Sequence, residues 1–216
     1  MGRFKHGLFG ECAREIGNGI TVLGHSPLRF SITKFIKSII NRSNGSAVLL
    51  VLPRGCPVDA LIYVANECTA LKHLALPSSL IPRQYFTIPN LVCKMKNLEM
   101  LTLEDSSNLQ ETLTPVSLHC KNLVGLDFTP GFALVHILED EASAIVTLLP
   151  NIKHLGLRHT FLQRKFLVMI LQGCKELVHL DVRNSIGFNV DDEILKLTSH
   201  IRTFMYEGSR EFIMVL

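Results

Sequence analysis

The chain has 216 residues, of which 47% are hydrophobic, and its 22 basic and 19 acidic residues give a formal net charge of +3. The charges are interspersed without a basic block, and the longest apolar runs have six residues, whereas a membrane-spanning helix needs roughly 18. These features exclude nucleic acid and membranes as expected partners.

The N-terminal part, residues 1–29, has several glycines, no repeated apolar pattern and no apolar stretch typical of a secretory signal. We therefore expect this segment to be irregular. We also expect the protein to reside in the cytoplasm and/or nucleus. The next stretch, from Ser31 to Arg42, has apolar residues at helical spacing and predicts an amphipathic helix.

From residue 47 onward, one pattern of three apolar positions, L-x-x-L-x-L, returns along the chain. Its copies follow one another at spacings of 24, 27, 25, 29, 25 and 24 residues and begin at Ala47, Leu71, Leu98, Leu123, Ile152, Leu177 and Ile201. Alternation within each copy predicts a short strand, and the apolar residues upstream of most copies have helical spacing.

A single helix and one short strand cannot bury their apolar faces alone, so the units must stack. The sequence therefore predicts an α/β leucine-rich-repeat solenoid, with a curved parallel sheet on the concave face and helices on the convex face. We expect one domain of about seven units over residues 30–207, followed by an apolar tail over residues 208–216.

Two features modify the predicted helices. The helical pattern between Asn108 and Cys120 contains Pro115, which we expect only in a proline-tolerant first turn. Acidic triplets at residues 139–141 and 191–193 stand at predicted helix starts, where carboxylates interact favourably with the helix dipole. A cation site is the alternative for the first triplet, but no loop of oxygen ligands accompanies it.

Three of the six cysteines, Cys68, Cys120 and Cys174, stand three residues before the first apolar position of a copy. This equivalence predicts buried, reduced thiols in a small apolar slot. Zinc sites and disulfides are the alternatives, but there is no C-x-x-C spacing, and equivalent positions in every second unit are too far apart to bond. We therefore expect no metal and no cofactor.

The outward positions of the strands line the concave surface of such a solenoid, and charged side chains and histidines gather in its rear half. The candidate partner-binding residues are His154, Arg158, His179, Asp181 and Arg183, with Asp127 and Glu104 on earlier strands. Arginine offers paired donors to carboxylate or phosphate, so an acidic peptide or a small anion is one expected ligand. The alternative is a solvated face with local Arg and Asp pairs.

Catalysis finds little support in this pattern. His154, His179 and Asp181 are residue types of acid–base chemistry, but no nucleophile, phosphate-binding loop or metal-ligand spacing accompanies them. We expect a monomeric protein that is not an enzyme and acts through protein–protein contacts.

Three stretches resemble the plant F-box/LRR-repeat proteins, namely His119–Leu123, Asp140–Pro150 and Ile170–Val182. The resemblance extends over about residues 28–209. It implies that the repeats recognise a protein target, as the substrate-recognition subunits of SCF ubiquitin ligases do. In that family an N-terminal helical F-box docks on the ligase adaptor.

An F-box is not recognisable in residues 1–29, and the chain has no tryptophan, a residue that an F-box often includes. Two functions are therefore expected. The first is a target-recognition module related to SCF ligases, within the ubiquitin conjugation pathway. The second is a free-standing leucine-rich-repeat scaffold or competitor without a ligase role. On both hypotheses the protein target lies on the concave face, and the expected affinity for the SCF adaptor is too weak to be useful.

Overall fold

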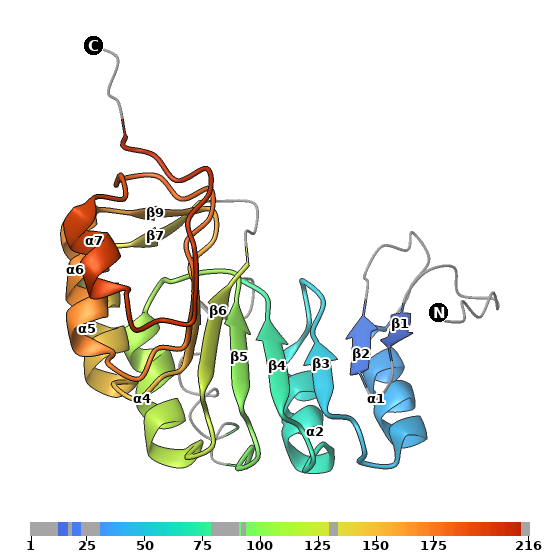
Figure 1. Cartoon of the computed structure of the whole chain (residues 1–216). Helices are drawn as coiled ribbons and strands as arrows, with labels where there is room; N and C mark the ends of the chain where they lie inside the picture. Colours follow the sequence, from blue (N-terminus) through green and yellow to red (C-terminus); the bar gives the residue numbers. More distant parts are fainter. Residues whose placement is uncertain are drawn as a thin grey trace.

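The computed structural model describes residues 13–16, 19–22, 31–78, 91, 94–129 and 134–212. Within them the fold is α/β, with a nine-stranded sheet in the order β1-β2-β3-β4-β5-β6-β8-β10-β11. The strands lie side by side along one face and the helices lie on the opposite face (Figure 1).

The strands of this sheet are β1 (Ala13–Ile16), β2 (Gly19–Val22), β3 (Leu49–Val51), β4 (His73–Leu76), β5 (Met100–Leu103), β6 (Gly125–Phe128), β8 (His154–Gly156), β10 (His179–Asp181) and β11 (Thr203–Met205). The helices with described bounds are α1 (Ile32–Ser43), α2 (Val58–Glu67), α4 (Leu109–His119), α5 (Glu139–Leu148), α6 (Arg164–Gly173) and α7 (Asp192–Leu197).

The strands that carry the repeated pattern pair in parallel and in one register. Leu126 of β6 pairs with Leu155 of β8, and Leu155 pairs with Leu180 of β10. All three side chains are fully buried, because side chains alternate along a strand and the shared register turns every pattern leucine toward the helices. These observations confirm the predicted leucine-rich-repeat solenoid.

The last strand, β11, keeps the register but loses much of the burial. Phe204 pairs with Leu180 yet is only partly buried, and Tyr206 is 39% exposed. The centroids of the two aromatic rings lie 5.0 Å apart. In the described part of the chain β11 is an edge of the sheet, so these aromatic residues have a neighbouring unit on one side alone.

Side-chain hydrogen bonds define the starts of the helices. Ser31 caps α1 by accepting a hydrogen bond from the Lys34 amide at 3.3 Å, which confirms the predicted amphipathic helix. At the start of α5, the Glu141 carboxylate accepts a hydrogen bond from the Leu138 amide at 2.9 Å. The Asp191 carboxylate accepts one from the Ile194 amide, also at 2.9 Å, at the start of α7. Both acidic triplets therefore stabilise helix starts, as predicted.

The expectation for Pro115 was wrong, because α4 continues through this residue to His119. Proline has no amide hydrogen for the carbonyl of Glu111, at a cost of about 3 kcal/mol in a helix interior. Burial of Leu113 and Val116 offsets this cost, since a buried aliphatic side chain contributes about 1.5 to 3 kcal/mol.

The N-terminal segment also differs from the expected irregular structure where it is described. β1 and β2 pair antiparallel, and β2 joins β3 in parallel, with Ile20 opposite Leu50. The edge of β3 would otherwise present unpaired backbone donors and acceptors, and β2 satisfies them. The rest of residues 1–29 lies outside the described part, and the division of the chain at residues 30 and 208 stays a prediction.

A second parallel sheet, which sequence analysis did not predict, follows the rear strands. β7 (Val135–Ile137) pairs with β9 (Thr160–Leu162), and single bridges join Phe161 to Ile186 and Ile186 to Arg210. A buried hydroxyl group holds the backbone between β8 and β9, because Ser185 donates to the Leu157 carbonyl at 2.6 Å. The rear units therefore have two strand-like segments each.

The three cysteines occupy the same position in their respective units, at the C-terminal ends of α2, α4 and α6. Cys68, Cys120 and Cys174 are buried and none of them is in a disulfide, as predicted. The thiol of Cys120 donates to the Met95 carbonyl at 3.5 Å, and the thiol of Cys174 donates to the Leu149 carbonyl at 3.9 Å. Each of these two contacts links a unit to the preceding one.

The helices of the described part include none that is both long and apolar enough to cross a membrane.

The buried register predicts a large stability difference between two neighbouring positions. Leu155→Ala should lower the free energy of unfolding by about 2 to 5 kcal/mol, because the side chain is fully buried. Lys153→Ala is the matched control, since Lys153 is exposed and next but one in sequence. Urea denaturation of both variants measures the difference, and equal losses would contradict the register.

The buried thiols predict a clear difference in labelling. Burial raises the pKa of Cys68 and of Cys174 to about 11, and that of Cys56 to about 12, so few thiolates form near neutral pH. In a chain with Cys12→Ser and Cys93→Ser, whose positions lie outside the described residues, we expect almost no reaction with a disulfide reagent when folded. All four remaining thiols should react in guanidinium chloride. Fast labelling of the folded chain would contradict the burial of these thiols.

Candidate functional site

The outward strand positions form two in-register columns on the concave face. In the first, His154 of β8 pairs with His179 of β10. In the second, Asp127 of β6 pairs with Gly156 of β8, which pairs with Asp181 of β10. The outward strand positions therefore align from unit to unit, and they bring histidine and aspartate side chains from three units together.

Four of the candidate residues form connected ion pairs, here called the concave charge cluster: Asp127, Arg158, Asp181 and Arg183. Arg183 donates to both carboxylate oxygens of Asp181, at 2.8 Å from Nη2 and 3.0 Å from Nε. Arg158 lies between two carboxylates, with Nη2 3.4 Å from Asp127 and Nε 3.5 Å from Asp181. Two positive and two negative charges therefore balance within the cluster.

The two carboxylates differ in how firmly they are held. Burial raises the pKa of Asp181, but hydrogen bonds from Arg183 and the charges of both arginines outweigh it and leave the pKa below its usual value. Burial also raises the pKa of Asp127, and the charge of Arg158 offsets this effect only in part. The Asp181–Arg183 pair is therefore the fixed part of the cluster, and Arg158 with Asp127 is the looser part.

Gly156 leaves a hollow that the Asp127 carboxylate fills. A Cβ atom at this position would lie 1.7 Å from Oδ1 of Asp127, far inside van der Waals contact. Beside the hollow, the ring centroids of His154 and His179 lie 5.9 Å apart. The missing side chain at position 156 therefore permits the contact between Asp127 and Arg158.

Glu104 lies apart from the concave charge cluster, although sequence analysis placed it in the same candidate set. Its carboxylate accepts hydrogen bonds from Arg54 Nε at 3.0 Å and from the Ser78 amide at 3.3 Å. It therefore connects the ends of the front units. The structure brings the other six candidate residues together on β6, β8, β10 and the residues that follow β8 and β10.

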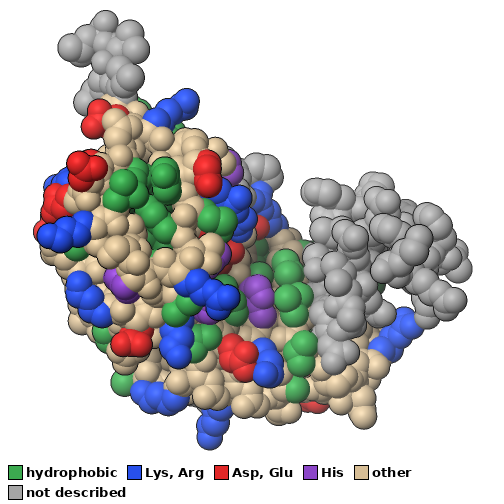
Figure 2. All heavy atoms as spheres, viewed as in Figure 1, with side chains coloured by type: hydrophobic (Ala, Val, Ile, Leu, Met, Phe, Trp, Pro, Cys, Tyr) green, Lys and Arg blue, Asp and Glu red, His purple; other side chains and the backbone are tan. Residues whose placement is uncertain are grey.

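The front of the concave face is largely apolar. Leu49, Val51 and Met100 are partly buried, and Figure 2 shows hydrophobic side chains over β3 and β4. His73 lies among them, with Nε2 2.7 Å from the Thr102 hydroxyl, and burial lowers its pKa. The face therefore changes from apolar to charged along the solenoid.

The chemistry of this face suits binding. Among the described residues, no group of three or more His, Cys, Asp or Glu side chains is placed to hold a metal ion. Arg158 and Arg183 remain 37% and 38% exposed, so both can also contact a partner while they pair with aspartate. The surface therefore offers positively charged hydrogen-bond donors within a cluster whose net charge is zero.

Comparison with known proteins finds similar sequences. No family model matches the chain. It is 30% identical over 162 residues to an F-box/LRR-repeat protein of Arabidopsis thaliana, covering 72% of this chain and 49% of the relative. The matched repeat region belongs to the plant F-box/LRR-repeat group.

Two further Arabidopsis thaliana members of the F-box group are similar to the chain. Putative F-box/LRR-repeat protein 23 is 26% identical over 171 residues, covering 78% of this chain and 38% of the relative. The F-box protein SKIP19 is 29% identical over 168 residues, covering 77% and 54%. The chain spans about half the length of the curated relatives it matches.

Two features of the site were missed by sequence reasoning. Arg54 pairs with Glu104 although it stands outside the outward columns, in the turn after β3. Sequence analysis gave Gly156 no role. A signal for Gly156 existed, because a glycine directly between two aspartates of one column leaves room for one of them to reach across.

The hollow at Gly156 predicts an energetic coupling with Asp127. Gly156→Ala should destabilise the chain because the new methyl group displaces the Asp127 carboxylate. In an Asp127→Ala background the same change should cost less, with a coupling of about 0.5 to 3 kcal/mol. Urea denaturation of the four chains measures this coupling.

Gly173→Ala provides the control for this cycle. A Cβ atom at Gly173 meets Val146 of the neighbouring helix, 2.2 Å from Cγ1, and not Asp127. Its effect should therefore add to that of Asp127→Ala without coupling. Additive effects for Gly156→Ala as well would show that the hollow does not position Asp127.

Proposed function

We propose that the chain recognises a protein target of an SCF-type E3 ubiquitin ligase, and that the target lies on the concave face. The chain is a leucine-rich-repeat module for protein interaction, of the F-box protein type, which supports the first part. The in-register sheet supports the second part, because its outward side chains form one continuous surface.

The proposed contact residues on the concave face are Glu104, Asp127, His154, Arg158, His179, Asp181 and Arg183. Arg158 is the central residue of this proposal, since its pairs at 3.4 and 3.5 Å are longer than those of Arg183. A carboxylate of the target can therefore recruit Arg158 at small cost, while Asp181 and Arg183 keep their geometry. An acidic segment is the target feature that fits this arrangement.

A scaffold or competitor without a ligase role is the second candidate. One structural observation favours it: residues 13–16 and 19–22 are strands of the sheet, whereas an F-box is helical. In this case the chain occupies the target and leaves the ligase adaptor unbound. The two candidates thus share the target surface and differ in adaptor binding.

Two measurements on the purified chain test these candidates: adaptor binding separates them, and competition tests the target surface that they share. Calorimetry should detect no useful affinity for the SCF adaptor, and submicromolar binding would overturn this expectation. Added to a ubiquitination assay that contains a full-length relative, the chain should reduce modification of the shared target, because both proteins occupy the same surface. Unchanged modification would contradict concave-face target recognition.

The competition assay also tests the contact residues. Arg158→Ala should weaken competition about tenfold, within the range seen when a charged interface residue is truncated. Arg42→Ala is the matched control, since Arg42 is an exposed arginine in the last turn of α1. Equal competition by both variants would remove Arg158 from the target contact.

A further inference from the structure

The last two helices are joined at their N-terminal ends by one arginine. Arg164, the first residue of α6, donates from Nε to Asp191 at 2.7 Å and from Nη2 to Glu193 at 2.5 Å. Asp191 caps α7 and Glu193 lies in its first turn. These bonds fix the start of α7 against the start of α6.

A groove of about 650 Å³ lies along α7, and its lining runs from the first turn of α7 past its C-terminal end: Lys175, Glu193, Lys196, Leu197 and His200. The helix α6 has 10 residues and α7 has only 6. The preceding interface is closed by contrast, since Gly173 of α6 lets Val146 of α5 approach its backbone.

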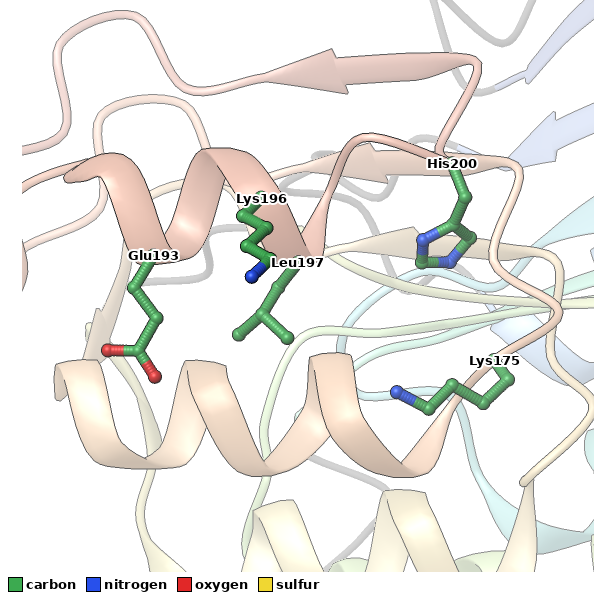
Figure 3. Close-up of a pocket in the computed structure, with 5 residues that line it drawn as sticks. All are labelled: Lys175, Glu193, Lys196, Leu197 and His200. Carbon is green, nitrogen blue, oxygen red and sulfur yellow. The ribbon is translucent and has the colours of Figure 1, made fainter.

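The groove is basic and partly apolar. Figure 3 shows the Lys196 and Lys175 side chains directed toward the space between the helices, with Leu197 between them and the ring of His200 at one end. Glu193 is already paired with Arg164. No carboxylate of the described residues lies within ion-pair distance of Lys175 or Lys196.

Interactions with the helix ends account for the position of Lys175 but not for that of Lys196. Cations near a helix C-terminus interact favourably with the dipole, and Lys175 Nζ donates to the Leu171 carbonyl of α6 at 3.4 Å. No contact of this kind is found for Lys196 in the described part of the chain, and its ammonium group points into the groove (Figure 3). Lys196 and Lys175 therefore present two positive charges on either side of an apolar side chain.

We propose that this groove binds an acidic segment of a partner protein, on the convex side and apart from the concave target surface. Carboxylates of the partner pair with Lys175 and Lys196, His200 borders the same end, and an apolar side chain rests on Leu197. The charge of the lining favours this occupant, because the cations are unpaired by carboxylates within the described residues and the acid is neutralised by Arg164. Leu197 favours a peptide over nucleic acid, which offers no apolar side chain.

Fluorescence anisotropy with a labelled peptide tests the proposal. The probe has two glutamates on each side of a leucine, and the control peptide has glutamine in place of glutamate. The whole chain should bind the first peptide and not the second, and binding should weaken as salt rises. Equal binding of both peptides, or no binding of either, would overturn the proposal.

Charge-reversal variants test whether the peptide binds in the groove. Lys175→Glu with Lys196→Glu should weaken binding about tenfold or more, since two attractive charges become repulsive. Lys121→Glu with Lys165→Glu is the matched control, on exposed parts of the same convex side, and should bind as the unchanged chain does. Thermal melts report the folding of each variant, and Lys196→Gln supplies a milder change if the double variant unfolds.

Two further outcomes would decide against this partner. Reduced thermal stability with unchanged peptide binding would show that the lysines serve the helix ends only. Tighter binding to anionic lipid vesicles or to duplex RNA than to the acidic peptide would assign the groove to a different class of partner.

Discussion

The parallel ladder between consecutive units is the constraint on which the rest of this structure depends. Each strand is too short to be stable alone, and its two apolar side chains are buried only when the neighbouring strand pairs in the same register. The fully buried column Leu126, Leu155 and Leu180 results from this pairing. A slip of one residue would turn these leucines to solvent, so the register is strongly specified.

The same register creates both surfaces of the molecule. Residues that alternate with the buried leucines form the concave columns, and charges from neighbouring units meet there as the concave charge cluster. On the convex side, tight packing of one helix against the next leaves little space, as the contact of Gly173 with Val146 shows. A groove opens where the stack nears its edge and the final helix is short. Both proposed binding surfaces therefore follow from how the units stack.

Sequence reasoning succeeded where one strong period controls the structure. Alternation and the spacing of the copies predicted the strand register, the outward columns and the slot shared by Cys68, Cys120 and Cys174. It failed where long-range contacts outweigh local preference. Pro115 stays inside α4 because its neighbours are buried, and β1 and β2 form because the edge of β3 offers hydrogen bonds. These effects depend on tertiary neighbours that no local pattern reveals.

The candidate site was predictable in its composition but not in its pairing. The columns show which side chains face outward, whereas the partners of each charge depend on side-chain reach across several strands. Glu104 reaches Arg54 and Ser78, and the hollow at Gly156 directs Asp127 toward Arg158. The second sheet escaped prediction for a related reason, since single bridges such as that of Ile186 leave no alternation in the sequence.

Scalar couplings across hydrogen bonds, measured by NMR, test the ladder most directly. The register predicts a coupling between the His179 amide nitrogen and the Lys153 carbonyl carbon, and another between the Leu157 amide nitrogen and the Asp181 carbonyl carbon, because those bonds are 2.9 and 2.7 Å long. Couplings displaced by one residue along either strand would contradict it. In that case the side chains of the displaced strand would exchange faces, and either His154 or His179 would point into the core.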